Sequence, residues 1–66
     1  MSVAKVVELL AEGSSIENAV EACAKEAAET IKGLKSIYVQ DIQAVLDGGK
    51  VSKYRVNCKV TFVVRG

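Results

Sequence analysis

Basic and polar side chains recur at every second position near the end of the chain, at Lys53, Arg55, Asn57 and Lys59. If this segment is a strand, all four lie on one face, because successive side chains of a strand point to opposite sides. A guanidinium flanked by two ammonium groups could bind an anion such as a nucleotide phosphate, and it could equally clamp a carboxylate. The pattern therefore predicts an anion site or ion pairs, and we favour ion pairs with Asp41 or Glu8, within or between subunits.

Three carboxylates outside the expected helix could together hold Ca²⁺, a hard cation that takes oxygen ligands. They are Glu8, Asp41 and Asp47. Their spacing is not that of an EF-hand loop. The alternative, which we prefer, is that Asp47 begins a turn and that Glu8 and Asp41 pair with lysine or arginine across a sheet. A calcium site remains the second interpretation of these residues.

Two cysteines and two tyrosines are the other side chains that could react or bind a ligand. Cys23 and Cys58 could form a redox pair or ligate a metal, but each falls among the apolar positions of its own segment. Free cysteine is among the most buried residue types, so we expect two core thiols. Tyr54 shares the apolar side of its segment and is expected in the core, whereas Tyr38 is more open to a ligand or interface role.

The composition argues against catalysis and against nucleic-acid binding. There is no histidine, and no serine or cysteine stands beside a base, so general acid–base chemistry would need a strongly shifted pKa. Nine basic and eight acidic residues are interspersed, with a net charge of +1 and no basic stripe for phosphates. We therefore expect a protein that is not an enzyme and has no nucleic-acid partner.

The hydropathy of the chain predicts no membrane partner. No apolar run approaches the roughly 20 residues that a membrane-spanning helix needs. The first residues lack the basic and apolar regions of a secretory signal. We expect a cytoplasmic protein with both thiols reduced.

Apolar residues at intervals of three and four predict one helix, with Ser14 as its N-cap. Glu17 lies three residues later and can complete a capping box. Gly33 is the expected stop, and Lys32 is expected in the last turn. The apolar stripe of this helix consists of Ile16, Val20, Cys23, Ala27 and Ile31.

Alternating apolar and polar residues predict strands over Val3–Leu10 and Ile37–Leu46, and a long closing strand that contains Lys53–Arg65. The segment between the first strand and the helix reads as a connector. Two glycines in Asp47–Lys50 supply the positive φ angles of a hairpin turn. The long closing strand fits best in the middle. We predict one α+β domain over residues 1–66, with β-α-β-β order and a three-stranded antiparallel sheet, ordered 1-3-2, around one helix.

The chain is very short for the apolar content that it carries. A 66-residue chain that is half apolar has little interior of its own, and two cysteines are too few for a disulfide scaffold. Small domains of this kind are often stabilised by oligomerisation. We therefore expect the protein to bind copies of itself.

Several of these features together resemble the dodecin family over essentially the whole chain. They are the opening KVVEL with Lys5 and Glu8, a Gly-Ser-Ser lead into an alanine-rich helix, Thr30 and Leu34 near its end, the hairpin, and the closing YRVNCKVTFVV. The resemblance implies a hollow dodecamer, with sheets lining the interior and helices outside. It also implies a non-enzymatic role in flavin storage and quenching.

The same resemblance implies where flavin would lie, and three positions depart from it. Flavin-binding dodecins carry a stacking tryptophan at the position of Ser36, a glutamine that reads the pyrimidine edge at Arg55, and often an arginine at Gln43. Ser36 has no aromatic face to stack, and Arg55 can only donate hydrogen bonds. A flavin-free branch, for which calcium binding has been described, also lacks the tryptophan.

The chain therefore resembles the flavin-free branch more closely at these positions. We expect no flavin cofactor, a Ca²⁺ ion as the one candidate cofactor, and storage of another small ligand or ion in the assembly. We further expect an ion pair between Arg55 and Asp41, from the adjacent strand or from a neighbouring subunit, to fill the vacated pocket. Flavin binding without the tryptophan and a purely structural assembly stay open as alternatives.

Overall fold

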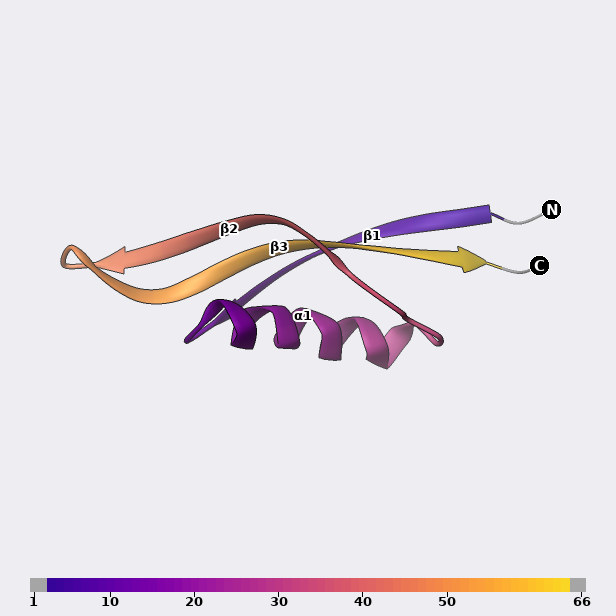
Figure 1. The fold of residues 1–66 in the computed structure, drawn as a ribbon, viewed down its shortest axis with the longest axis horizontal. Coiled ribbons are helices and arrows are strands. Elements are labelled where there is room, and N and C mark those ends of the chain that lie inside the picture. Colours follow the sequence, from indigo (N-terminus) through magenta and orange to yellow (C-terminus); the bar gives the residue numbers. More distant parts are fainter. Residues whose placement is uncertain (1–2, 65–66) are drawn as a thin grey trace.

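The computed structural model describes residues 3–64 and confirms the predicted order of elements. The elements are β1 (Val3–Gly13), α1 (Ile16–Thr30), β2 (Tyr38–Asp47) and β3 (Lys50–Val64). The three strands form one sheet in the order β1-β3-β2, and both pairs are antiparallel. The single helix α1 lies along one face of this sheet, while the β2–β3 hairpin extends past it (Figure 1). The fold predicted from the alternation is therefore confirmed.

The long strand β3 is central because it pairs along both of its edges. Its register with β1 runs from Val3 opposite Val64 to Gly13 opposite Tyr54. Its register with β2 runs through the hairpin turn, where Gly48 and Gly49 adopt φ angles of 59° and 81°. These angles lie in the region that favours glycine, so the turn predicted from its two glycines is confirmed.

The first strand is longer than predicted, and this shifts the start of the helix. β1 continues through Gly13, where an added Cβ would lie 2.6 Å from the backbone nitrogen of Ala19. Only glycine permits this approach of strand and helix, because any side chain would meet backbone atoms. The segment read as a connector is therefore mostly strand.

The N-cap of α1 is Ser15, so the capping box predicted from Ser14 and Glu17 is wrong. The Ser15 hydroxyl accepts a hydrogen bond from the Asn18 backbone N–H at 3.0 Å. Ser14 instead accepts one from the Asn18 side-chain amide at 2.7 Å. Glu17 remains in the first turn, where a negative charge suits the helix dipole.

The C-terminus of α1 also falls earlier than predicted. The helix ends at Thr30, and Ile31 is already extended, with φ −120° and ψ 118°. Two successive β-branched residues favour this early change to an extended backbone. Lys32 therefore lies in the turn beyond the helix, and Gly33 takes a φ of 76° there. Among the described residues, no helix is both long and apolar enough to cross a membrane.

The core lies between α1 and the middle of β3 and is built from small side chains. Its fully buried members are Ala19, Cys23, Ala27, Val56, Cys58 and Val60. Alanine and cysteine on the helix let its backbone lie close to the sheet, and no member is larger than valine. Leu9, Ala11, Val20, Ile37 and Val39 pack around this cluster.

The two thiols are buried in this core, as predicted. Burial first, and then a hydrogen bond with Cys58 and the charge of Cys58, together raise the pKa of Cys23 to about 12. Thiolates rather than thiols are the reactive species, so a thiol with this pKa is chemically inert at neutral pH. The geometry therefore supports the structural interpretation of Cys23 and not the redox one.

Candidate functional site

The sheet face opposite α1, here called the open face, carries most of the side chains that were predicted from the sequence to bind a ligand or to form ion pairs. On β3, the residues that alternate with the buried Val56 and Cys58 point to this face. Residues directly opposite one another in an antiparallel pair share a face. The open face therefore consists of rows: Glu8–Lys59–Tyr38, Leu10–Asn57–Asp41, Glu12–Arg55–Gln43 and Lys53–Val45.

A β-bulge in β2 decides which of its residues join these rows. The register shifts between Val39 and Asp41, so that Val39 lies opposite Cys58 and Asp41 lies opposite Asn57. A bulge inserts an extra residue into one strand and re-aims the side chains beyond it. Val39 consequently packs against the core while Asp41 joins the open face.

One row contains a converging set of ion pairs centred on Glu12. The Lys53 ammonium donates to Glu12 Oε1 at 2.9 Å. The Arg55 guanidinium donates to Glu12 Oε2 twice, from Nε at 2.8 Å and from Nη2 at 2.6 Å. Hydrogen bonds from Lys53 and then Arg55 lower the pKa of the Glu12 carboxyl. Glu12 is therefore ionised at neutral pH and satisfied by two cations.

Within one chain Arg55 pairs with Glu12 and not with the predicted Asp41. A pair between Arg55 and Asp41 of a neighbouring subunit stays a prediction. Asp41 lies opposite Asn57, whereas Glu12 lies directly opposite Arg55 on the other flank of β3. Glu12 was not among the predicted partners, because the first strand was expected to end at Leu10. The signal was present, since Glu8, Leu10 and Glu12 continue the same period of two.

The three positions that the family resemblance connected with flavin are not brought together within one chain. Gln43 and Arg55 lie opposite one another on the open face. Ser36 instead lines a pocket of about 400 Å³ next to Thr61 on β3. Thr61 is six residues from Arg55 along the strand, a separation of roughly 20 Å. Only residues from different copies could place all three positions around one ligand.

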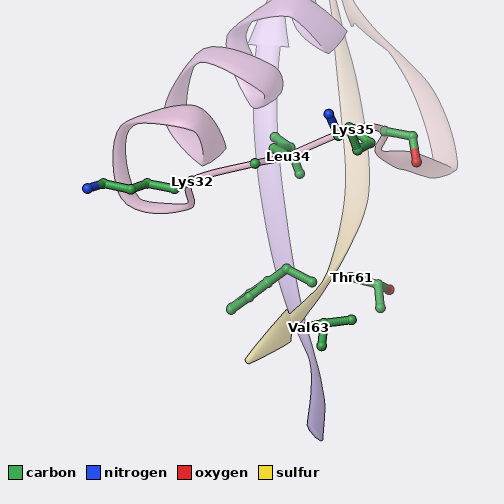
Figure 2. Close-up of a pocket in the computed structure, with 8 residues that line it drawn as sticks. Lys32, Leu34, Lys35, Thr61 and Val63 are labelled. Carbon is green, nitrogen blue, oxygen red and sulfur yellow. The ribbon is translucent and has the colours of Figure 1, made fainter. Parts of the chain in front are cut away.

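The pocket at Ser36 lies between the segment after α1 and the last part of β3 (Figure 2). Its wall is partly apolar, from Leu34, Phe62 and Val63, and partly polar. Lys32 extends away from the strand in this view.

The carboxylates considered for calcium lie apart from one another. Glu8 is opposite Lys59, Asp41 is opposite Asn57, and Asp47 is opposite Lys50 beside the hairpin turn. Within residues 3–64, no three acidic, cysteine or histidine side chains gather in a group that could hold a metal ion. A calcium site formed by one described chain is therefore not supported, and the turn position of Asp47 fits the alternative interpretation.

The remaining predicted residues fall into exposed and half-buried positions. Tyr38 is 66% exposed at the beginning of β2, opposite Lys59, as a ligand or interface residue would be. Tyr54 is half-buried on the helix side, opposite Gly13. The Asn57 side-chain oxygen is buried and accepts no hydrogen bond from the described part of the chain. A donor from outside the chain would satisfy it.

Comparison with known proteins is decisive for the family. Residues 3–65 match the family model described as Dodecin. The chain belongs to the dodecin family. The fold of this dodecin matches a variant of the T. thermophilus dodecin with a TM-score of 0.87 and 27% identity, over 100% of both chains.

Two further dodecin structures share the fold at lower identity. The dodecin from Streptomyces davaonensis is 18% identical with a TM-score of 0.83, covering 98% of this chain and 97% of its own. The dodecin from Streptomyces coelicolor is 20% identical with a TM-score of 0.86, covering 98% and 94%. No curated protein matches the sequence.

Proposed function

We propose that this dodecin is a non-enzymatic binding protein that assembles into a hollow dodecamer and holds a small ligand other than flavin on its open face. One observation carries the proposal: the open face is not covered by any element of the described chain. The helix α1 lies on the opposite side of the sheet (Figure 1), where its buried residues pack against Val56 and Cys58 of β3. Open-face residues such as Leu10, Tyr38 and Val63 are 64%, 66% and 56% exposed.

The surface area of one chain supports assembly. The accessible surface is 5057 Å², whereas a compact monomer of 7.0 kDa exposes roughly 4,000 Å². The excess of roughly 1,000 Å² is comparable to the ~800 Å² that each partner buries in a standard interface. Association with further copies would remove this apolar area from water, which is the main driving force of most assemblies.

The chemistry at the family's flavin positions supports loss of flavin affinity. Ser36 offers a hydroxymethyl group where flavin-binding members stack an indole, so the π-stacking contribution is absent. Arg55 already donates two hydrogen bonds to Glu12 and has no acceptor for the donor groups of a flavin edge. Both features support the proposal that this dodecin resembles the branch without the tryptophan, and they disfavour the alternative of a flavin-binding protein.

Calcium remains a secondary proposal, restricted to a site between copies. A single chain offers separated carboxylates, so any Ca²⁺ would have to draw oxygen ligands such as Asp41 from two or more copies. A rise in melting temperature with Ca²⁺ but not with Mg²⁺ would support this site. Equal responses to the two cations would exclude it.

Riboflavin titration tests the ligand part of the proposal. We expect the purified protein to be colourless and to leave riboflavin fluorescence almost unchanged, because nothing at Ser36 can stack on the ring. A flavin-binding dodecin that carries the tryptophan, titrated with riboflavin in parallel, serves as the positive reference for the assay. Tight binding with strong quenching would show that flavin affinity persists and would overturn this part of the proposal.

A further inference from the structure

The charged groups of the open face balance within one chain. Three cations of β3 and three carboxylates of the flanking strands lie on this face, namely Lys53, Arg55 and Lys59, and Glu8, Glu12 and Asp41. Among these described groups, the hydrogen-bonded ion pairs converge on the single carboxylate of Glu12. The local charge of the Lys53–Arg55 pair therefore depends mainly on one residue.

Glu12 occupies the donors that an external anion would need. Lys53 contacts one of its oxygens, and two nitrogens of Arg55 contact the other. An ammonium group beside a guanidinium that donates two hydrogen bonds is also an arrangement that binds phosphate. The side chain of Glu12 thus takes the position of an anionic ligand on these two cations.

Glu12 competes with an external anion because its carboxylate is tethered beside the two cations, and not because the ion pair itself is strong. The side chains of Lys53, Glu12 and Arg55 are 45%, 37% and 35% exposed, so water screens their attraction and the pair adds little to stability. The Glu12 carboxylate is nevertheless fixed on the adjacent strand, which gives it an effective concentration of at least the order of millimolar. A free phosphate ligand of equal intrinsic affinity, present at micromolar concentration, would therefore be outcompeted by Glu12.

We propose that Glu12 determines the charge of the ligand that the open face accepts. Its carboxylate closes the Lys53–Arg55 cation pair to phosphate groups and restricts the face to uncharged ligands. Removal of this single charge converts the row into a phosphate-binding site. The inference rests on the proposed function only in locating the ligand on the open face.

Titration with inorganic pyrophosphate, followed by calorimetry, tests the role of Glu12. We expect Glu12→Gln to bind pyrophosphate at least about tenfold more tightly than the wild type, since the tethered competitor is gone. Glu8→Gln is the matched control, because Glu8 lies on the same face of β1, opposite Lys59, and its substitution changes the net charge equally. Combining Glu12→Gln with Arg55→Gln should abolish the gain.

A second substitution at the same position controls for the possibility that Glu12→Gln does not fold. Glu12→Thr removes the carboxylate and retains a residue that favours strands, so it should show the same gain. Circular dichroism and particle mass should match the wild type for each variant compared. Equal gains in Glu12→Gln and Glu8→Gln, or no gain in folded Glu12→Gln and Glu12→Thr, would overturn the inference. Riboflavin binding by the wild type would refute the proposed loss of flavin affinity without altering these results.

Discussion

We propose that Arg55 changes the ligand chemistry of the open face, while the fold stays that of the dodecin family. It lies between Glu12 and Gln43 in a single row of the sheet. Two of its N–H groups donate to Glu12. A guanidinium has no acceptor, so Arg55 can offer a ligand only its remaining donors. Arg55 thus forms an ion pair within one chain, with a carboxylate from β1 rather than with Asp41 of β2. That such a pair fills a vacated flavin pocket stays a prediction.

We predict that flavin affinity is gained only when two positions are changed together. We expect Ser36→Trp combined with Arg55→Gln to gain measurable quenching of riboflavin fluorescence, because the pair supplies a stacking surface and a group that both donates and accepts. Ser36→Trp alone should gain little, since Arg55 stays bound to Glu12. Ser36 lines a pocket with Thr61, which is roughly 20 Å along β3 from Arg55, so the two substituted positions act on one ligand only if copies assemble.

The control for this experiment is Ser52→Trp with Arg55→Gln, which places an indole on the exposed hairpin instead. It should leave riboflavin fluorescence unchanged. Equal quenching by the single Ser36→Trp and the double variant would mean that Arg55 is a bystander and that stacking alone limits flavin affinity.

At the scale of elements, β1 and the start of α1 are where the structure departs from the sequence-based expectation. Ser14 and Ser15 are both plausible caps by residue type, and only the continuation of β1 through Gly13 decides between them. The structure assigns the cap to Ser15, which accepts the Asn18 backbone N–H.

Substitution of the two serines separates these assignments. Ser15→Ala should lower the free energy of unfolding by about 1 kcal/mol, the usual contribution of an N-cap. Ser14→Ala should cost clearly less, because Ser14 bonds only the exposed side-chain amide of Asn18. Chemical denaturation of both variants measures the difference. A larger loss for Ser14→Ala would contradict the assigned cap.

Much of the fold followed from local patterns, because the patterns matched what the elements bury. The alternation of Val56, Cys58 and Val60 with polar residues predicted a strand with one buried face, and these three are fully buried. Glu12 was missed for a physical reason: Ala, Glu and Gly before two serines read as a turn, and only pairing with β3 keeps them extended. Pairing partners and bulges depend on tertiary context, which local periodicity does not contain.

At the scale of the whole molecule, one chain is too elongated to be a self-sufficient domain. Its extents are 52 × 17 × 13 Å, and its radius of gyration is 13.9 Å, against about 11 Å for a compact domain of this length. The hairpin extends beyond the helix and carries Ile42, Leu46 and Val51, which are 54%, 61% and 50% exposed (Figure 1). Further copies of the chain would cover these side chains.

The particle mass in solution tests this account most directly. Light scattering or sedimentation of the purified protein should give a mass near twelve times the 7.0 kDa of one chain, because the exposed apolar side chains and the excess surface require partners. The mass should persist on dilution to micromolar concentration. A folded, stable monomer near 7.0 kDa would contradict the account, since the open face and the hairpin would then be ordered without any partner.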